Sequence, residues 1–290
     1  MKYIKFQDKK GTFTIQSPEN YSGLYFPLAG DGGLKSSITP NLGGDSKTDQ
    51  NHFLLEPVSI ENLHNNRSTR NFWCRIEGKG CWSATGISAE QELQKFTEAQ
   101  DKSILEAGFM WQKVTRTSAK YGLQSEITSF VDVDGAAEIE LVRIKNISEE
   151  VTKITPIAAI PLYGRSADNI RDHRHVTSLL HRINTTEYGV EVTPVLSFDE
   201  RGHQKNHTTY FVYGYSEKGD APEAFYPTVQ EFMGEGGTYL NPEAVRENKP
   251  GRKAGGRAEG KEAMGGIRFA DVELKPQETA GFIILAGLTE

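Results

Sequence analysis

The 290 residues are enough for two ordinary domains or for one large all-β domain. Charged residues make up 25% of the chain and the formal net charge is −6, so the composition lacks the basic balance of a nucleic-acid-binding protein. The sequence shows neither the apolar region of a signal peptide nor an apolar run long enough to span a membrane. We therefore expect a cytoplasmic protein without nucleic acid or membrane contacts.

Short β-type runs separated by Gly, Asn, Asp and Pro favour a large antiparallel sandwich over alternating β/α units. Residues 137–141 alternate apolar and acidic side chains, which predicts a strand whose acidic face meets water. Residues 282–286 are apolar throughout and predict a strand buried on both faces. The other predicted strands cover residues 3–6, 12–15, 71–76, 109–117, 123–133, 137–145, 151–160, 188–195, 208–215, 267–274 and 281–288.

Few segments have helical signals. Ser88 and Gln91 form a capping-box pattern that predicts a short helix over residues 89–96, and residues 228–233 could make one or two turns. Residues 243–266 are rich in Gly, Lys, Arg and Glu, which predicts an exposed loop, with a phosphate-contacting loop as the alternative.

The two cysteines, Cys74 and Cys81, lie beside Trp73 and Trp82. We expect them in a strand pair as small apolar residues, with a disulfide or a metal site as alternatives. The glycine-rich stretches 30–33 and 234–237 lack the context of a nucleotide-binding loop and are interpreted as turns.

Aromatic residues alternate at Phe211, Tyr213 and Tyr215, which favours the core face of a strand, with a sugar-stacking platform as the alternative. Carboxylates that could flank a glycosidic bond are scattered, and sequence spacing cannot show whether two are held at the distance that glycosidase chemistry needs. The candidates are Asp168, Asp172, Asp199 and Glu200.

Residues 161–183, which read PLYGRSADNIRDHRHVTSLLHRI, hold four arginines, three histidines and two aspartates between two strand-like runs. Ordering so many polar groups is costly without a polar partner. His173 and His175 would share one face of a strand and could hold a metal, but no third ligand is evident. A polar binding or interface role is favoured, with a hydrogen-bonded structural loop as the alternative.

Four stretches together resemble the N-terminal region of the glycoside phosphorylases of glycoside hydrolase family 94. The resemblance covers the whole chain, residues 1–290, and in detail is closest to the 1,2-β-oligoglucan phosphorylases. The stretches are the opening YIKF…GTFTI with YFPLAG and SSITPNLGGD, then EIELVRIKNISEEVTKI, then FMGEG running into LNPEAV, and finally FADVELKPQET before an apolar strand.

The resemblance implies a galactose-mutarotase-like β-supersandwich, with a catalytic (α/α)6 barrel expected downstream and absent from this chain. It implies an inverting phosphorolysis of β-1,2-glucooligosaccharides such as those of the sophorose series, with inorganic phosphate as co-substrate and no cofactor or metal. No catalytic residue is carried over. In the family's homodimers a loop of this domain reaches over the partner subunit's active site, and by order along the chain it corresponds to residues 165–175. The implied acceptor-side contacts are Arg165, Asp168, Asn169, Asp172, His173 and Arg174.

Three alternatives stay open. One is a cellobiose-type or other β-glucan phosphorylase of the same family. Another is a stand-alone carbohydrate-binding sandwich with its ligand on Trp82, Tyr213, Tyr215 or Tyr226. The third is a mutarotase-like epimerase. On the phosphorylase interpretation, the isolated domain is expected to be inactive and to expose apolar surface.

Overall fold

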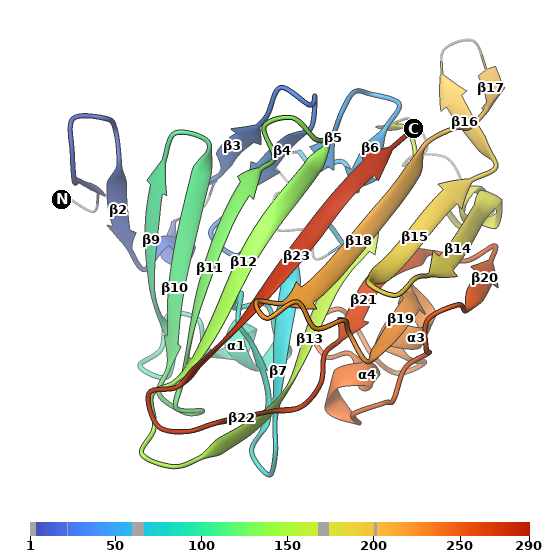
Figure 1. Cartoon of the computed structure of the whole chain (residues 1–290). Coiled ribbons are helices and arrows are strands. Elements are labelled where there is room, and N and C mark those ends of the chain that lie inside the picture. The colour runs from blue at the N-terminus through green and yellow to red at the C-terminus, as the bar shows by residue number, and fades with distance from the viewer. Residues whose placement is uncertain (1–3, 22, 60–66, 168–173, 200–201) are drawn as a thin grey trace.

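The computed structural model describes residues 4–21, 23–59, 67–167, 174–199 and 202–290. These residues form a β-sandwich whose front layer is one eleven-stranded sheet (Figure 1). All its strand pairs are antiparallel. In sheet order the strands are β1 (Ile4–Phe6), β2 (Phe13–Gln16), β9 (Lys102–Gly108), β10 (Trp111–Ser118), β11 (Leu123–Val131), β12 (Ala137–Asn146), β23 (Thr279–Thr289), β18 (Thr209–Ser216), β15 (Gly189–Pro194), β14 (His181–Thr185) and β20 (Arg257–Glu259).

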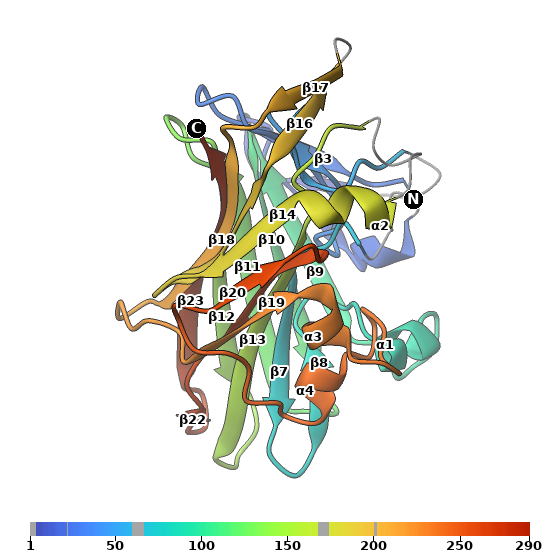
Figure 2. The ribbon, with the colours of Figure 1, turned by 90° about the vertical axis from the view of Figure 1, so that its right-hand side faces the viewer.

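Behind the large sheet lie a six-stranded and a four-stranded sheet, and a two-stranded ribbon projects at one end (Figures 1 and 2). The six-stranded sheet contains β19 (Ala224–Thr228), β21 (Ala263–Arg268), β13 (Thr152–Leu162), β7 (Asn71–Ile76), β8 (Gly80–Ser83) and β22 (Val272–Leu274). The four-stranded sheet contains β3 (Phe26–Ala29), β4 (Lys35–Ile38), β5 (Ser46–Lys47) and β6 (Phe53–Leu55), and the ribbon is β16 (Leu196–Asp199) with β17 (Gly202–Lys205).

Helices are short and lie outside the main core. α3 (Val229–Met233) and α4 (Glu243–Arg246) cover the outer face of the six-stranded sheet, where a second apolar cluster including Trp73, Tyr226 and Phe232 is buried (Figure 2). The remaining helices are α1 (Ala89–Gln94), α2 (Arg174–Thr177) and the 3-10 turns η1 (Pro18–Asn20) and η4 (Ser178–Leu180). Among the described residues no helix is long and apolar enough to cross a membrane.

The predicted capping box is confirmed. The Gln91 N–H donates to Ser88 Oγ at 3.2 Å, and α1 begins at Ala89. The helix ends at Gln94, before the predicted limit, because the backbone of Lys95 turns to a ψ of 135°, which is outside the helical region. Phe96 then adopts a positive φ of 63°. Cys74 and Cys81 lie in the β7–β8 strand pair as free thiols, as expected.

Residues 137–141 form the first half of β12, but the predicted orientation is wrong. Glu138 and Glu140 are 1% and 4% exposed and face the core, whereas Ile139 and Leu141 lie half-buried on the outer face. The cause is a cation inside the sandwich, Arg70, which pairs with both carboxylates. A period of two shows that the faces differ, and the buried cation decides which face turns inward.

Two further strand predictions are corrected in the same way. In β23, Phe282 and Ile284 face the core while Ile283 and Leu285 are half-buried on the outer face, so this strand is not covered on both sides. Strands that are covered on both sides occur in the six-stranded sheet, as in β13, because α3 and α4 pack beyond it. In β18 the core residues are Tyr210 and Val212, and the aromatic series 211, 213 and 215 lies on the outer face.

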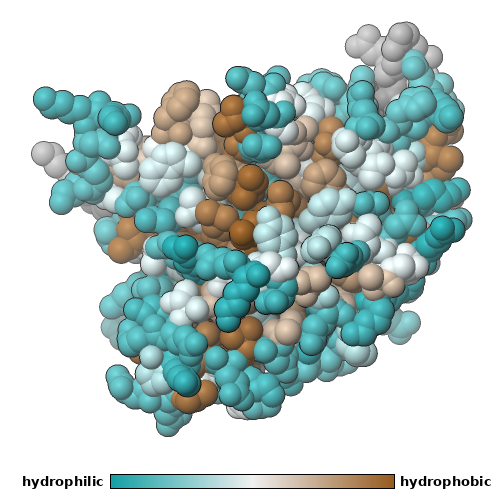
Figure 3. Space-filling view, in the orientation of Figure 1, coloured by the Kyte–Doolittle hydropathy of each residue, from teal (hydrophilic) through white to brown (hydrophobic). Residues whose placement is uncertain are grey.

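The outer face of the large sheet therefore carries an apolar row. Trp111, Phe130, Ile139, Leu285 and Tyr213 are neighbours in register across five adjacent strands. In Figure 3, hydrophobic side chains gather over the upper and middle part of this face. The five side chains are half-buried, so part of this apolar row meets solvent.

The predicted exposed loop 243–266 is also corrected. Its two ends are structured and partly buried, because Ala244 and Val245 in α4 and Met264 in β21 pack in the second apolar cluster. β20 pairs with β14 in the middle of the segment. The predicted strand 267–274 is likewise two strands, β21 and β22.

Candidate functional site

The edge predicted to meet a sugar begins where β13 ends. After Leu162 the chain passes through Gly164, whose φ of +60° suits glycine, and its backbone pairs with β6: Phe53 N–H donates to the Arg165 carbonyl at 3.0 Å. Residues 174–180 then form α2 and η4 before β14 starts at His181. The segment 168–173 thus connects two ordered flanks that belong to different layers.

Arg165 joins those flanks. Its side chain is 4% exposed, Nη1 donates to Thr177 Oγ1 at 2.6 Å, and Nη2 lies 2.9 Å from Glu262 Oε2. Nε donates to His181 Nε2 at 3.4 Å, while His181 Nδ1 donates to the Lys261 carbonyl at 3.1 Å. These contacts require the neutral His181 tautomer with its proton on Nδ1.

The space around this guanidinium is nearly filled. The cavity that Arg165 lines with Asn51, His181 and Tyr210 has a volume of about 10 Å³, which is room for a single water and not for a sugar. In this arrangement Arg165 links the end of β13 to Thr177 in α2 and to Glu262, the residue before β21. A direct acceptor contact from Arg165 stays a prediction.

The other predicted contacts cannot be placed. Asp168, Asn169, Asp172 and His173 lie outside the described residues. Arg174 opens α2, but its side chain, like that of His175, is outside the description. Two of the residues named for a stand-alone binding platform are excluded from that role, because Trp82 and Tyr226 are 1% and 2% exposed.

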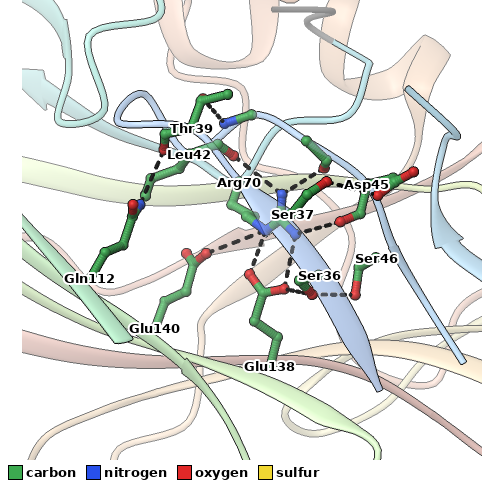
Figure 4. Close-up of polar contacts among 12 residues, drawn as sticks. Ser36, Ser37, Thr39, Leu42, Asp45, Ser46, Arg70, Gln112, Glu138 and Glu140 are labelled. Carbon is green, nitrogen blue, oxygen red and sulfur yellow. Dashed lines mark hydrogen bonds and ion pairs between the residues drawn. The ribbon is translucent and has the colours of Figure 1, made fainter. Parts of the chain in front are cut away.

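Sequence reasoning missed a buried charged cluster, which lies inside the sandwich (Figure 4). Arg70 Nε donates to Glu138 Oε1, and Nη2 donates to Glu138 Oε2 at 2.9 Å, which makes a bidentate pair. Arg70 Nη1 also donates to the Gly44 carbonyl at 2.7 Å, and the Ser36 hydroxyl donates to Glu138. The cluster fastens the glycine-rich stretch 36–45 to the large sheet.

Glu140 is the second carboxylate of this cluster, with Oε1 at 3.8 Å from Arg70 Nε. Burial and the neighbouring Glu138 carboxylate raise the pKa of Glu140 well above its ordinary value, against the attraction of Arg70. One cation therefore faces two carboxylates, and burial favours the protonated form of Glu140. Since Arg70 and Glu138 are 0% and 1% exposed at their side chains, the cluster is structural and does not meet a substrate.

A match to a family model identifies the fold. The model of the supersandwich domain of glycosyl hydrolase 94 matches residues 30–290. The chain belongs to glycoside hydrolase family 94. The match confirms the family resemblance and the supersandwich fold class. No curated protein matches the chain.

Solved structures with a similar course of the chain are distant. A bacterial glucoamylase complexed with acarbose is 8% identical with a TM-score of 0.49, and the match covers 88% of this chain and 30% of that one. A putative kojibiose phosphorylase from the human microbiome is 9% identical with a TM-score of 0.45, over 99% of this chain and 33% of that one. A putative aldose 1-epimerase from Escherichia coli K12 is 9% identical with a TM-score of 0.44, over 92% and 99%. The chain thus spans about a third of the first and second of these proteins.

Proposed function

We propose that the chain is the non-catalytic sandwich domain of an inverting phosphorylase that acts on β-1,2-glucooligosaccharides. The observation that carries the proposal is the family match over residues 30–290. The finer assignment to β-1,2-linked glucans is supported by the sequence stretches that resemble the 1,2-β-oligoglucan phosphorylases. A cellobiose-type specificity is the alternative within the family.

The proposed reaction transfers the non-reducing-end glucose to phosphate. A phosphate oxygen bonds to the anomeric carbon, the glycosidic C–O bond breaks, and a carboxylic acid of the enzyme protonates the departing oxygen. The products are α-glucose 1-phosphate and a glucan one unit shorter. On the family resemblance, the catalytic acid is expected in a helical barrel outside this chain.

The role proposed for this domain is support of a homodimer and of the acceptor-side rim in the partner subunit's active site. The support is local: the rim loop starts and ends on ordered elements, and Arg165 ties its base to Thr177 and Glu262. Pre-formed flanks lower the entropic cost of ordering a loop around an acceptor.

The test uses the whole enzyme that contains this chain. Sophorotriose and phosphate should release α-glucose 1-phosphate, whereas the 290-residue chain alone should release none. A matched assay with cellotriose distinguishes the alternative specificity. Release of α-glucose 1-phosphate from neither substrate would contradict the proposal.

A rim role of the loop is tested in the same enzyme with Arg165→Met. Loosening the base of an acceptor loop should raise the KM for sophorotriose and leave kcat nearly unchanged. Arg182→Met is the control, because that arginine pairs with the exposed Glu259 on the neighbouring strand. Equal KM values for the two variants would argue against a rim function.

A further inference from the structure

A pocket of about 310 Å³ opens at the edge of the sandwich, away from Arg165. Its walls come from η1, from the turn after β4 and from the residues that follow α1. Glu19, Asn20, Asn41, Lys95 and Phe96 line it. The volume falls within the range of small-molecule sites.

One side chain ties the walls together. Gln100 Oε1 accepts a hydrogen bond from the Phe96 N–H at 2.7 Å, and its Nε2 donates to Glu19 Oε1 at 3.1 Å and to Asn20 Oδ1 at 3.0 Å. The second oxygen of Glu19 accepts from the Ser103 hydroxyl. The polar groups of the pocket are therefore held in place before a ligand arrives.

A buried arginine orients the deepest of these groups. Asn41 is 7% exposed, and its Oδ1 accepts from Arg116 Nη2 at 3.2 Å. Because a guanidinium only donates, this contact fixes the amide and leaves Asn41 Nδ2 as a donor that bonds to no other group among the described residues. Arg116 is itself 3% exposed, forms no ion pair within the described part of the chain, and its Nε is buried without a partner. Such a buried cation is costly and is unusual in a purely structural position.

Strained backbone surrounds the same pocket. Phe96 has a φ of 63° and is 77% exposed, so an aromatic ring is displayed from a conformation that such residues rarely adopt. Ser17 and Leu42, the chain neighbours of the pocket residues Pro18 and Asn41, have φ values of 48° and 60°. Strain of this kind clusters at binding sites, where the surrounding structure enforces it.

The lining chemistry selects the ligand. The exposed Phe96 ring offers a face for the C–H side of a sugar ring, and the carboxylate and amides match hydroxyl groups. An anionic ligand is not favoured. The one lysine of the lining, Lys95, is paired with Glu92 at 2.8 Å, and the Glu19 carboxylate would repel an anion.

We propose that this pocket binds a neutral saccharide, with Phe96 stacked on the ring and with Asn41 Nδ2 and the Glu19 carboxylate bonded to its hydroxyls. Only the choice of a glucan as the probe rests on the proposed function. The pocket shares no lining residue with the cavity at Arg165.

The test is an NMR titration of the 290-residue chain with sophorose, with cellobiose and glucose as further arms. Amide shifts should change around Asn20, Asn41 and Phe96, and Phe96→Ala and Asn41→Ala should each weaken binding about tenfold or more. Phe109→Ala is the matched control, because Phe109 is 82% exposed on the turn between β9 and β10 and should bind like the parent chain. Unfolding midpoints in urea confirm that each variant is folded.

The inference is overturned if no saccharide shifts the pocket resonances, or if Phe96→Ala binds as tightly as Phe109→Ala. The measurement uses no phosphate and no catalytic barrel, so it is independent of phosphorolysis. If the chain binds the saccharide but the phosphorolysis assay fails, the proposed reaction is contradicted and the proposed pocket is supported. If phosphorolysis occurs but the chain binds no saccharide, only the proposed pocket is contradicted.

Discussion

Arg70 and Arg165 are both buried, but they serve different regions of the molecule. Arg70 lies between the layers and meets two glutamates of one strand, Glu138 and Glu140. Arg165 lies at the edge and divides its donors among one carboxylate, one hydroxyl and one neutral imidazole. The core arginine balances charge and joins the sheets. The edge arginine uses its hydrogen bonds to hold together the chain segments on either side of a loop.

The largest effect is expected at the core. Arg70→Met leaves Glu138 buried without a cation, so the free energy of unfolding should fall by about 3–5 kcal/mol. Urea unfolding at pH 7 measures it. A loss below about 1 kcal/mol would show that Glu138 simply takes up a proton at little cost.

The edge arginine should matter less for stability. Arg165→Met should cost about 1–3 kcal/mol, because Glu262 is 22% exposed and can rehydrate after the loss of its partner. Hydrogen exchange should accelerate at Thr177 and His181 and stay unchanged in β12. Faster exchange throughout β12 would place Arg165 in the same cooperative unit as Arg70.

Because Glu140 belongs to the core cluster, the stability that this cluster contributes should depend on pH, unlike that of the edge at Arg165. Because its pKa is raised in the folded chain, Glu140 stabilises the fold fully below its unfolded pKa of about 4.3, and this stabilisation is lost as the pH rises toward the folded pKa. Glu140→Gln mimics the protonated side chain. As the pH rises from about 5 to about 9, the free energy of unfolding in urea should therefore fall less for Glu140→Gln than for the parent chain. Parallel stability curves for the two proteins would mean that Glu140 is ionised in the fold.

The smallest effect is expected on the outer surface. Arg143 and Glu217 pair at 3.0 Å, but their side chains are 56% and 41% exposed. Arg143→Ala should change the free energy of unfolding by less than about 1 kcal/mol, and the change should shrink further in salt. Urea unfolding with and without added salt measures this change. The value for the exposed pair is the reference for the stability losses at the two buried arginines.

The sequence was sufficient for much of the scaffold. Turn residues and period-two patterns located most long strands of the large sheet, and the capping box at Ser88 located α1. The short strands β3 to β6 were missed because they are too brief to establish a period, and α4 because its apolar pair Ala244 and Val245 sits among charged residues.

The interior could not be predicted because it depends on contacts distant in sequence. Arg70 and Glu138 are 68 residues apart, and nothing next to Arg70 marks it as a core residue. The acceptor edge was predicted from its density of polar residues and stays a prediction. That density did not show that Arg165 is buried, because its burial depends on Glu262, which lies far along the chain.

The inward orientation of Glu138 and Glu140 has a practical consequence for anyone redesigning this domain. A standard solubility redesign would treat these glutamates as free surface positions and would retain Ile139 and Leu141 as core. Charge reversal to lysine would then place two more cations beside Arg70, while the hydrophobic residues would stay on the outside. Substitutions at Ile139 and Leu141 are the ones that would alter the solvent face.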